Sequence, residues 1–213
     1  EFALLRSLKH PNIMNVHGEL TFQGRLSFAS EFHSGGSLER RLFGGHSQLW
    51  PSVRQQLLWA RDLCRALQYL HSAVLHRDVK SANAVISADN RLVLIDFGLA
   101  VEEGEKSQAE LVGQGTAQWM SPEAFGVDVG IGTATDVWSF GCLLIELFAA
   151  VRPWAGLKQA DIVSAFRERR TPPDVQRIEN SDMRALCQSC LELLTSARPS
   201  AETIVSKINA LLD

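Results

Sequence analysis

Three side chains that can act on a phosphoryl group lie close together near the middle of the chain. Asp78, Lys80 and Asn83 occur in the stretch "LHRDVKSANAVI", between a helical pattern and a short apolar run. A carboxylate in such a loop can accept the proton of an attacking hydroxyl. A lysine can neutralise phosphoryl charge, and an amide oxygen can bind a hard metal ion. Taken alone, such a cluster in a polar turn is more often structural than catalytic.

A fourth candidate, Asp96, follows the apolar run "LVLI" and precedes Phe97 and Gly98. A short apolar run of this kind predicts a buried strand, so we expect the carboxylate at a strand end with Phe97 packed beneath it. A carboxylate in that place can hold Mg²⁺. Three further polar segments follow in order: "GTAQWMSPE" (115–123), "DVWSFG" (136–141) and "ARPS" (197–200).

The elements that must position these residues are mostly helical, with a few strands early in the chain. Ser52 and Gln55 resemble a capping box at the start of a long helix. Its apolar stripe consists of Val53, Leu57, Ala60, Leu63, Leu67 and Leu70. In the first part of the chain we predict a helix over 1–9, strands around 13–16 and 26–30, and a hinge at 33–38 followed by a short helix. The long helix runs from 53 to about 71, and a hairpin of 84–86 and 92–95 comes next. The rest of the chain is predicted to be helical, over 135–150, 158–169, 181–194 and 200–212. The fold class is therefore α+β.

Composition excludes several classes of function. With 24 acids, 21 bases and a net charge of −3, we expect no nucleic-acid binding through a general positive field. The longest apolar run, 137–151, is too short for a membrane span and contains Glu146, so we predict a buried core helix. Cys187 and Cys190 lie at helical spacing without a second pair. They are expected to be core thiols of a cytoplasmic protein.

The whole ordered set resembles the eukaryotic protein kinases. "HRDVKSAN" (76–83) resembles their catalytic loop, and 96–123, from "DFG" to "SPE", resembles their activation segment. The resemblance implies a bilobal fold with a mostly helical larger lobe over 34–213. Residues 1–33 would be the remnant of the smaller lobe and the hinge, with one helix and two strands only.

The resemblance implies a catalytic role for each of the four polar side chains. Asp78 would orient the substrate hydroxyl or accept its proton, and Lys80 would contact the γ-phosphate of ATP. Asn83 and Asp96 would bind Mg²⁺, which spreads the charge on the phosphates.

The resemblance also implies a nucleotide site. The backbone of Glu31, Phe32 and His33 would bind adenine above Val85, and Ser30 would be a small gatekeeper residue. An apolar spine would stack four side chains, namely His76, Phe97, Leu5 and Val16.

Two structural ties are implied as well. Glu123 and Arg198 match a buried ion pair, and Asp136 matches the acid that holds the catalytic loop. The alternatives are a solvated loop acid for Glu123 and, for Asp136, a helix-start acid favoured by the dipole.

Regulation through the activation segment is a further expectation. Arg77 would bind a phosphate there with a bidentate fork, and phosphorylation of Ser107 by an upstream activating kinase would order the segment. Alternatively, one of three acids supplies the negative charge permanently, namely Glu102, Glu103 or Glu105. A third reading is a solvated acidic loop without a regulatory role.

The acceptor is predicted to be serine or threonine. Lys80 occupies the position that holds Lys in serine/threonine kinases, and Thr116 can hydrogen-bond to Asp78 and Lys80. "HRDVKSAN" and "GTAQWMSPE" further resemble the tyrosine-kinase-like and MAP-kinase-kinase-kinase branches.

Two parts of the kinase pattern are missing from the sequence. No G-x-G-x-x-G occurs, no Lys precedes residue 9, and Glu1 resembles the helix glutamate with which the missing lysine would pair. The chain is therefore expected to be an N-terminally incomplete catalytic domain of a kinase family that transfers the γ-phosphate of ATP to a protein substrate. Without the Gly-rich loop and the lysine, phosphate positioning is lost, so the resemblance leaves the activity of this chain alone open. The alternatives are a pseudokinase-like binding module and a purely structural role, but the intact Asp78, Lys80, Asn83 and Asp96 favour the first reading.

Overall fold

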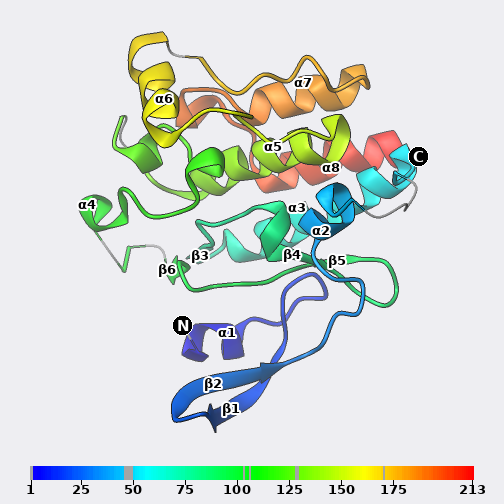
Figure 1. Ribbon diagram of the computed structural model, residues 1–213, viewed down its shortest axis with the longest axis vertical. Helices are drawn as coiled ribbons and strands as arrows, with labels where there is room; N and C mark the ends of the chain where they lie inside the picture. The colour runs from blue at the N-terminus through cyan, green and yellow to red at the C-terminus, as the bar shows by residue number, and fades with distance from the viewer. Residues whose placement is uncertain (1, 46–49, 103, 106, 128–129, 170) are drawn as a thin grey trace.

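The computed structural model describes residues 2–45, 50–102, 104–105, 107–127, 130–169 and 171–213. Most of the helices gather in one body, and a two-stranded sheet lies with α1 at the opposite end of the molecule (Figure 1). The predicted α+β class, with a mostly helical main body, is confirmed.

The N-terminal part consists of α1 (Phe2–Ser7) and the antiparallel pair β1 (Val16–Phe22) and β2 (Arg25–Ser30). Gln23 and Gly24 both have positive φ, as a tight hairpin turn requires. The strand predicted around 13–16 is misplaced, because β1 begins only at Val16. Ile13 forms only an isolated bridge with Leu94, because the backbone around it bonds to β5 instead.

Two helices follow the hinge region. In α2 (Leu38–Phe43), the Ser37 side chain accepts a hydrogen bond from the Arg40 amide. In α3 (Val53–Leu70), Ser52 accepts one from the Gln55 amide at 3.2 Å, so the predicted start of the long helix is confirmed. Val53 itself is 51% exposed and does not belong to the apolar stripe, because the first turn of α3 projects beyond the core.

Two short antiparallel sheets frame the polar loop. β3 (Val74–Leu75) pairs with β6 (Val101–Glu102), and β4 (Ala84–Ile86) pairs with β5 (Leu92–Leu94) as the predicted hairpin. A 3-10 turn, Ser81–Asn83, leads into β4. The 76–83 loop therefore leaves one sheet and enters the other, and Asp96 follows the end of β5.

The helical body is built around α5 (Thr133–Ala149), whose residues from Thr135 to Leu147 are all buried. α7 (Ser181–Cys190) packs against α5, and α8 (Ala201–Leu212) packs against α3. The remaining elements are α4 (Gln108–Leu111), α6 (Gln159–Ser164) with a π turn over Ala165–Arg169, and 3-10 turns at Ala117–Trp119, Glu123–Phe125 and Thr195–Ala197.

The predicted helix over 181–194 is too long, since α7 ends at Cys190. The carbonyls of Glu192 and Leu193 turn instead toward the guanidinium of Arg198, which donates a hydrogen bond to each. Both carbonyls after the helix end therefore have a partner outside the helix.

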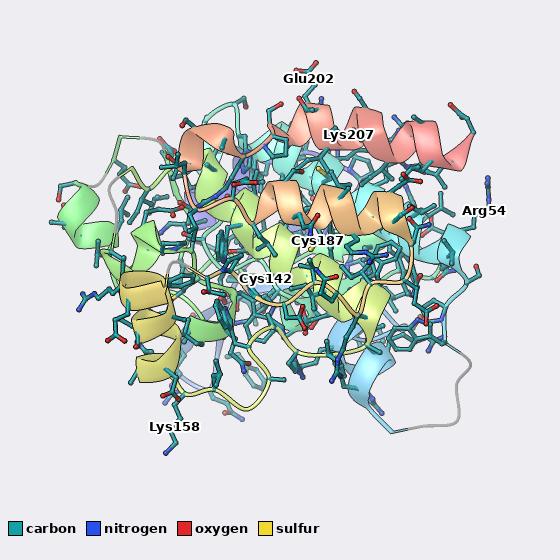
Figure 2. All side chains as sticks on the ribbon, turned by 90° about the horizontal axis from the view of Figure 1, so that it is seen from above. Arg54, Cys142, Lys158, Cys187, Glu202 and Lys207 are labelled. Carbon is teal, nitrogen blue, oxygen red and sulfur yellow. The ribbon has the colours of Figure 1, made fainter. Side chains whose placement is uncertain are left out.

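The four cysteines are buried thiols in the core, as predicted for Cys187 and Cys190. Figure 2 shows Cys142 and Cys187 in the middle of the helical body, with Lys158, Glu202 and Lys207 at its rim. Burial raises the pKa of Cys190 to about 12. No helix in the described ranges has the length and apolar character needed to cross a membrane.

Close packing of α5 on α7 requires a glycine at position 141. A Cβ added there would lie 2.9 Å from the Cys190 Cβ and 3.0 Å from Leu191 carbons. Gly141→Val should therefore lower the free energy of unfolding by about 1–3 kcal/mol through overpacking, measured by urea denaturation. Gly18→Val is the control, because an added Cβ there meets no atom within 4 Å. Equal stability of the two variants would contradict this account of the interface.

Candidate active site

Asp78 lies at the centre of a compact polar cluster. Lys80 Nζ donates to Asp78 Oδ2 at 2.6 Å, and Thr116 Oγ1 donates to Oδ1 at 2.7 Å. The Asn83 amide donates to Asp78 Oδ2 at 2.8 Å and to its backbone carbonyl at 2.9 Å. Lys80 Nζ also donates to Thr116 Oγ1 at 2.6 Å. The fold thus brings Asp78, Lys80, Asn83 and Thr116 together in one hydrogen-bonded cluster.

These contacts keep Asp78 ionised. Burial raises the pKa of the carboxyl, but the hydrogen bonds from Lys80 and Thr116 and the Lys80 charge outweigh burial and hold it below its usual value. Asp78 is therefore a fixed carboxylate at neutral pH, with both oxygens oriented by donors.

The side chain of Asp96 is exposed to solvent. Its backbone has a φ of +63°, in the left-handed region, which is uncommon for a residue other than glycine. The Ile95 amide donates to the Asn83 carbonyl at 2.9 Å, so the end of β5 is tied to the 76–83 loop. Asp96 therefore follows directly after the residue that is bonded to Asn83.

The pair Asn83 and Asp96 fits a magnesium ion. Within the described ranges, the only hydrogen bond to the Asp96 side chain comes from the Gly98 amide at 3.3 Å, and the Asn83 amide oxygen accepts no hydrogen bond. These are hard oxygen donors, and Mg²⁺ commonly takes one or two protein ligands together with substrate phosphates. That part of the chain contains no group of three or more His, Cys, Asp and Glu side chains placed to hold a metal ion.

Asp136, in the first turn of α5, binds the backbone at the start of the 76–83 loop. Its carboxylate accepts the His76 amide at 2.9 Å and the Arg77 amide at 2.7 Å, and His71 Nε2 lies 3.1 Å from it. Burial raises the pKa of Asp136, but the hydrogen bond and electrostatic attraction of His71, together with the hydrogen bond from the His76 amide, outweigh burial and hold the pKa below its usual value. A helix-dipole role alone does not account for these three contacts.

The side chain of Arg77 binds the segment 96–123, mainly through backbone carbonyls of that segment. Its guanidinium donates to the Leu99 carbonyl at 3.3 Å, to the Leu111 carbonyl at 2.7 Å and to the Gln114 side chain at 3.4 Å. Ser107 forms the N-cap of α4, where its hydroxyl donates to Glu110 Oε2 at 2.6 Å. In the described ranges Arg77 and Ser107 share no hydrogen bond, so the phosphate-binding role of Arg77 stays a prediction.

The acidic residues proposed as an alternative to phosphorylation are placed only in part. Glu102 and Glu105 are exposed, and Glu105 accepts a hydrogen bond from the Glu102 amide. Glu103 lies outside the described residues, so the choice between these interpretations stays open.

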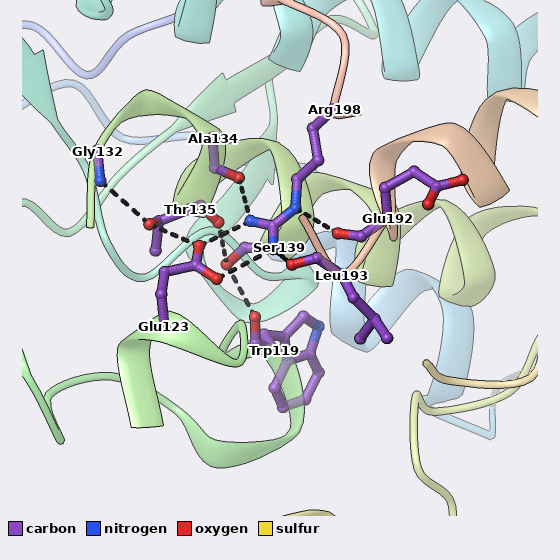
Figure 3. A network of polar contacts seen from close by, with 9 residues as sticks. All are labelled: Trp119, Glu123, Gly132, Ala134, Thr135, Ser139, Glu192, Leu193 and Arg198. Atoms are coloured by element: carbon purple, nitrogen blue, oxygen red, sulfur yellow. Dashed lines mark hydrogen bonds and ion pairs between the residues drawn. The ribbon is translucent and has the colours of Figure 1, made fainter. Parts of the chain in front are cut away.

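The Glu123–Arg198 pair joins the end of that segment to the C-terminal helices (Figure 3). The guanidinium makes two hydrogen bonds to the carboxylate, at 2.7 and 3.0 Å, and both side chains are 0% exposed. It also donates to the carbonyls of Ala134, Glu192 and Leu193, while Thr135 donates to Glu123. Glu123 is thus a buried, fully partnered carboxylate and not a solvated loop acid.

The expected nucleotide-binding residues of the hinge are largely exposed. Ser30, Glu31 and Phe32 are exposed, with Phe32 91% exposed, and His33 is half-buried. The Gly35 amide donates to the Ile86 carbonyl, and the Ile86 amide donates to the Gly36 carbonyl, so the hinge region runs beside the half-buried Val85. Glu1 lies outside the described residues.

The expected spine contacts are present in part. The rings of His76 and Phe97 meet edge to face at 4.7 Å. Phe97, Leu5 and Val16 belong to one buried hydrophobic cluster. Burial lowers the pKa of His76, so the imidazole is neutral at physiological pH.

Sequence reasoning missed a second buried acid, Glu146, near the end of α5. Ser81 Oγ donates to it at 2.8 Å, Trp119 Nε1 at 3.0 Å and Arg152 at 3.0 Å. The signal was a single acid within the apolar run 137–151, which indicates a buried carboxylate with partners. The partners themselves could not be read from the sequence.

Comparison with known proteins points to one family. The family model described as "Protein kinase domain" matches residues 1–208. The chain is 31% identical over its full length to the serine/threonine-protein kinase CTR1 of Arabidopsis thaliana, and 31% identical over 99% of its length to the probable serine/threonine-protein kinase SIS8 of the same plant. It is 29% identical over 96% of its length to mitogen-activated protein kinase kinase kinase 3 of Arabidopsis thaliana. The chain spans 26%, 20% and 33% of the lengths of these relatives.

Replacing one partner of the buried Glu123–Arg198 pair should destabilise the chain more than replacing both. Arg198→Met leaves the Glu123 carboxylate buried without its counter-charge, which should lower the free energy of unfolding by about 3–5 kcal/mol. The exposed Arg25→Met is the matched control, measured by urea denaturation. The double variant Glu123→Leu with Arg198→Met should lose less than Arg198→Met alone, because no unpaired charge remains. A double variant at least as unstable as the single one would contradict this reading.

Proposed function

This chain belongs to the protein kinase family, within the serine/threonine class, and we propose that it transfers the γ-phosphate of ATP to a serine or threonine hydroxyl of a protein substrate. The observation that carries the proposal is the Asp78 carboxylate, which Lys80, Thr116 and Asn83 hold in one orientation. General bases need this combination of an ionised group and a fixed direction.

In the proposed reaction, the acceptor oxygen forms a bond to the γ-phosphorus while the bond from that phosphorus to the bridging oxygen of ADP breaks. Asp78 takes the proton of the hydroxyl, and ADP leaves with the negative charge. Lys80 is the cation beside Asp78 and would offset charge on the transferred group. Thr116 fixes the oxygen of Asp78 that Lys80 does not bind directly.

Asn83 and Asp96 would hold Mg²⁺, which when bound supplies neutralisation of phosphate charge. Adenine would bind to the backbone of Glu31, Phe32 and His33 above Val85, with Ser30 as gatekeeper. In this proposal residues 1–33 belong to the smaller lobe and hinge, and 34–213 to the larger lobe.

The acceptor class is supported by two observations. Thr116 and Lys80 are hydrogen-bonded to each other at 2.6 Å, and the relatives CTR1 and SIS8 carry the words serine/threonine-protein kinase in their names. Because another relative is called a mitogen-activated protein kinase kinase kinase, we also propose that the substrate is itself a protein kinase. An upstream kinase that phosphorylates Ser107 would be a second partner. The four buried thiols support a cytoplasmic location.

The test is phosphate transfer by the chain itself. Purified chain with ATP and Mg²⁺ should place phosphate on serine or threonine residues of a generic protein substrate, detected by mass spectrometry. Asp78→Asn should lower the rate by about 10²- to 10⁴-fold, the range that a general base contributes. Asp89→Asn, an exposed acid in the β4–β5 turn, should retain the wild-type rate.

Two results would contradict the proposal. One is a chain that transfers no phosphate, and the other is an Asp78→Asn variant as active as the wild type. Nucleotide binding without transfer would favour a binding module instead.

A further inference from the structure

A second acid of α5 is as deeply buried as Asp136 but contacts a different part of the site. Glu146 is 0% exposed and lies near the C-terminal end of the helix. Ser81 Oγ donates to its Oε1 at 2.8 Å, and the indole Nε1 of Trp119 donates to its Oε2 at 3.0 Å. Each carboxylate oxygen therefore accepts a hydrogen bond from a different segment of the chain.

The two donors are close in sequence to the residues around Asp78. Ser81 directly follows Lys80 and begins the 3-10 turn that ends at Asn83. Trp119 ends the 3-10 turn that follows Thr116. Lys80 and Thr116 are the two residues that bind opposite oxygens of Asp78. One carboxylate thus joins the two short turns on which the geometry around Asp78 depends.

A cation compensates the buried charge. Arg152 donates to Glu146 Oε1 at 3.0 Å and to Glu39 in α2 at 2.7 Å, and its guanidinium lies 4.3 Å from the centre of the Phe43 ring. Burial raises the pKa of Glu146, and the hydrogen bonds from Ser81 and Trp119 and the Arg152 charge act against this rise. A buried carboxylate with partners on three sides is a rigid attachment point.

We propose that Glu146 is a positioning residue, which holds Ser81 and Trp119 in register and thereby sets the distance between Lys80 and Thr116 across Asp78. The effect on rate rests on the proposed phosphotransfer. The coupling of the two turns through the Glu146 carboxylate is independent of the proposed phosphotransfer, because it is a property of the fold alone. An acid that merely fills the core would change stability without linking Ser81 to Trp119.

The coupling can be measured without turnover. The chain has five tryptophans, and Trp119→Phe identifies which indole N–H signal in a ¹H–¹⁵N NMR spectrum belongs to Trp119. Ser81→Ala removes one hydrogen bond from Glu146, and we expect the Trp119 signal to shift although Trp119 is unchanged. Ser189→Ala is the matched control, because it removes a serine hydrogen bond in α7 that does not involve Glu146. The control should leave the signal in place.

The kinetic measurement uses the same variants. Ser81→Ala and Trp119→Phe should each lower kcat, by up to about 100-fold for a displacement near 1 Å, with the KM for ATP close to wild type. The double variant should lose less than the product of the single losses, since both act through Glu146. Glu146→Gln should shift the Trp119 signal as well, if that variant folds.

The outcomes separate the two proposals. A Trp119 signal that does not move in Ser81→Ala overturns the coupling. Independent, multiplicative losses in kcat also overturn it. A wild-type chain that transfers no phosphate contradicts the proposed function alone, because the NMR measurement still decides whether Glu146 links the two turns.

Discussion

The buried carboxylate of Asp136 is the interaction on which the rest of the site depends. It accepts the backbone amides of His76 and Arg77 and so holds Arg77 at a φ of +69°. Such a conformation costs free energy in a residue with a side chain and persists only where the surroundings determine it. Because Asp78 is the next residue, this constraint directs its carboxylate toward Lys80 and Thr116.

The helix that carries Asp136 organises three polar ties at once. Asp136 binds the start of the 76–83 loop, and Glu146 binds its end through Ser81 and the neighbouring segment through Trp119. The first turn of α5 also contacts the Glu123–Arg198 pair, through the Ala134 carbonyl and the Thr135 hydroxyl. Because α5 is buried from Thr135 to Leu147, it is a rigid support for these contacts. The residues that position the site therefore lie in the core, while Asp96 is exposed to solvent.

Much of this arrangement could be predicted from the sequence, because local patterns determine it. The α3 cap, the β4–β5 hairpin and the meeting of Asp78, Lys80, Asn83 and Thr116 follow from capping, turn chemistry and an ordered set of motifs. The errors arose where distant residues decide the structure. Residues 12–14 bond to β5 instead of forming the start of a strand, and the partners of Glu146 come from positions far apart in the chain. Periodicity carries no information on such pairings. The roles in binding nucleotide and substrate remain proposals.

The central claim is that the 76–83 loop and Asp96 form a site for a nucleotide with its magnesium ion. Calorimetric titration of the chain with a non-hydrolysable ATP analogue, with and without Mg²⁺, tests it most directly, since Asn83 and Asp96 would act through the ion. We predict binding that requires Mg²⁺ in the wild type and that falls in Asp96→Asn, even with Mg²⁺, toward the affinity that the wild type shows without the ion. Binding of equal strength with and without Mg²⁺ in the wild type, or no binding at all, would contradict it.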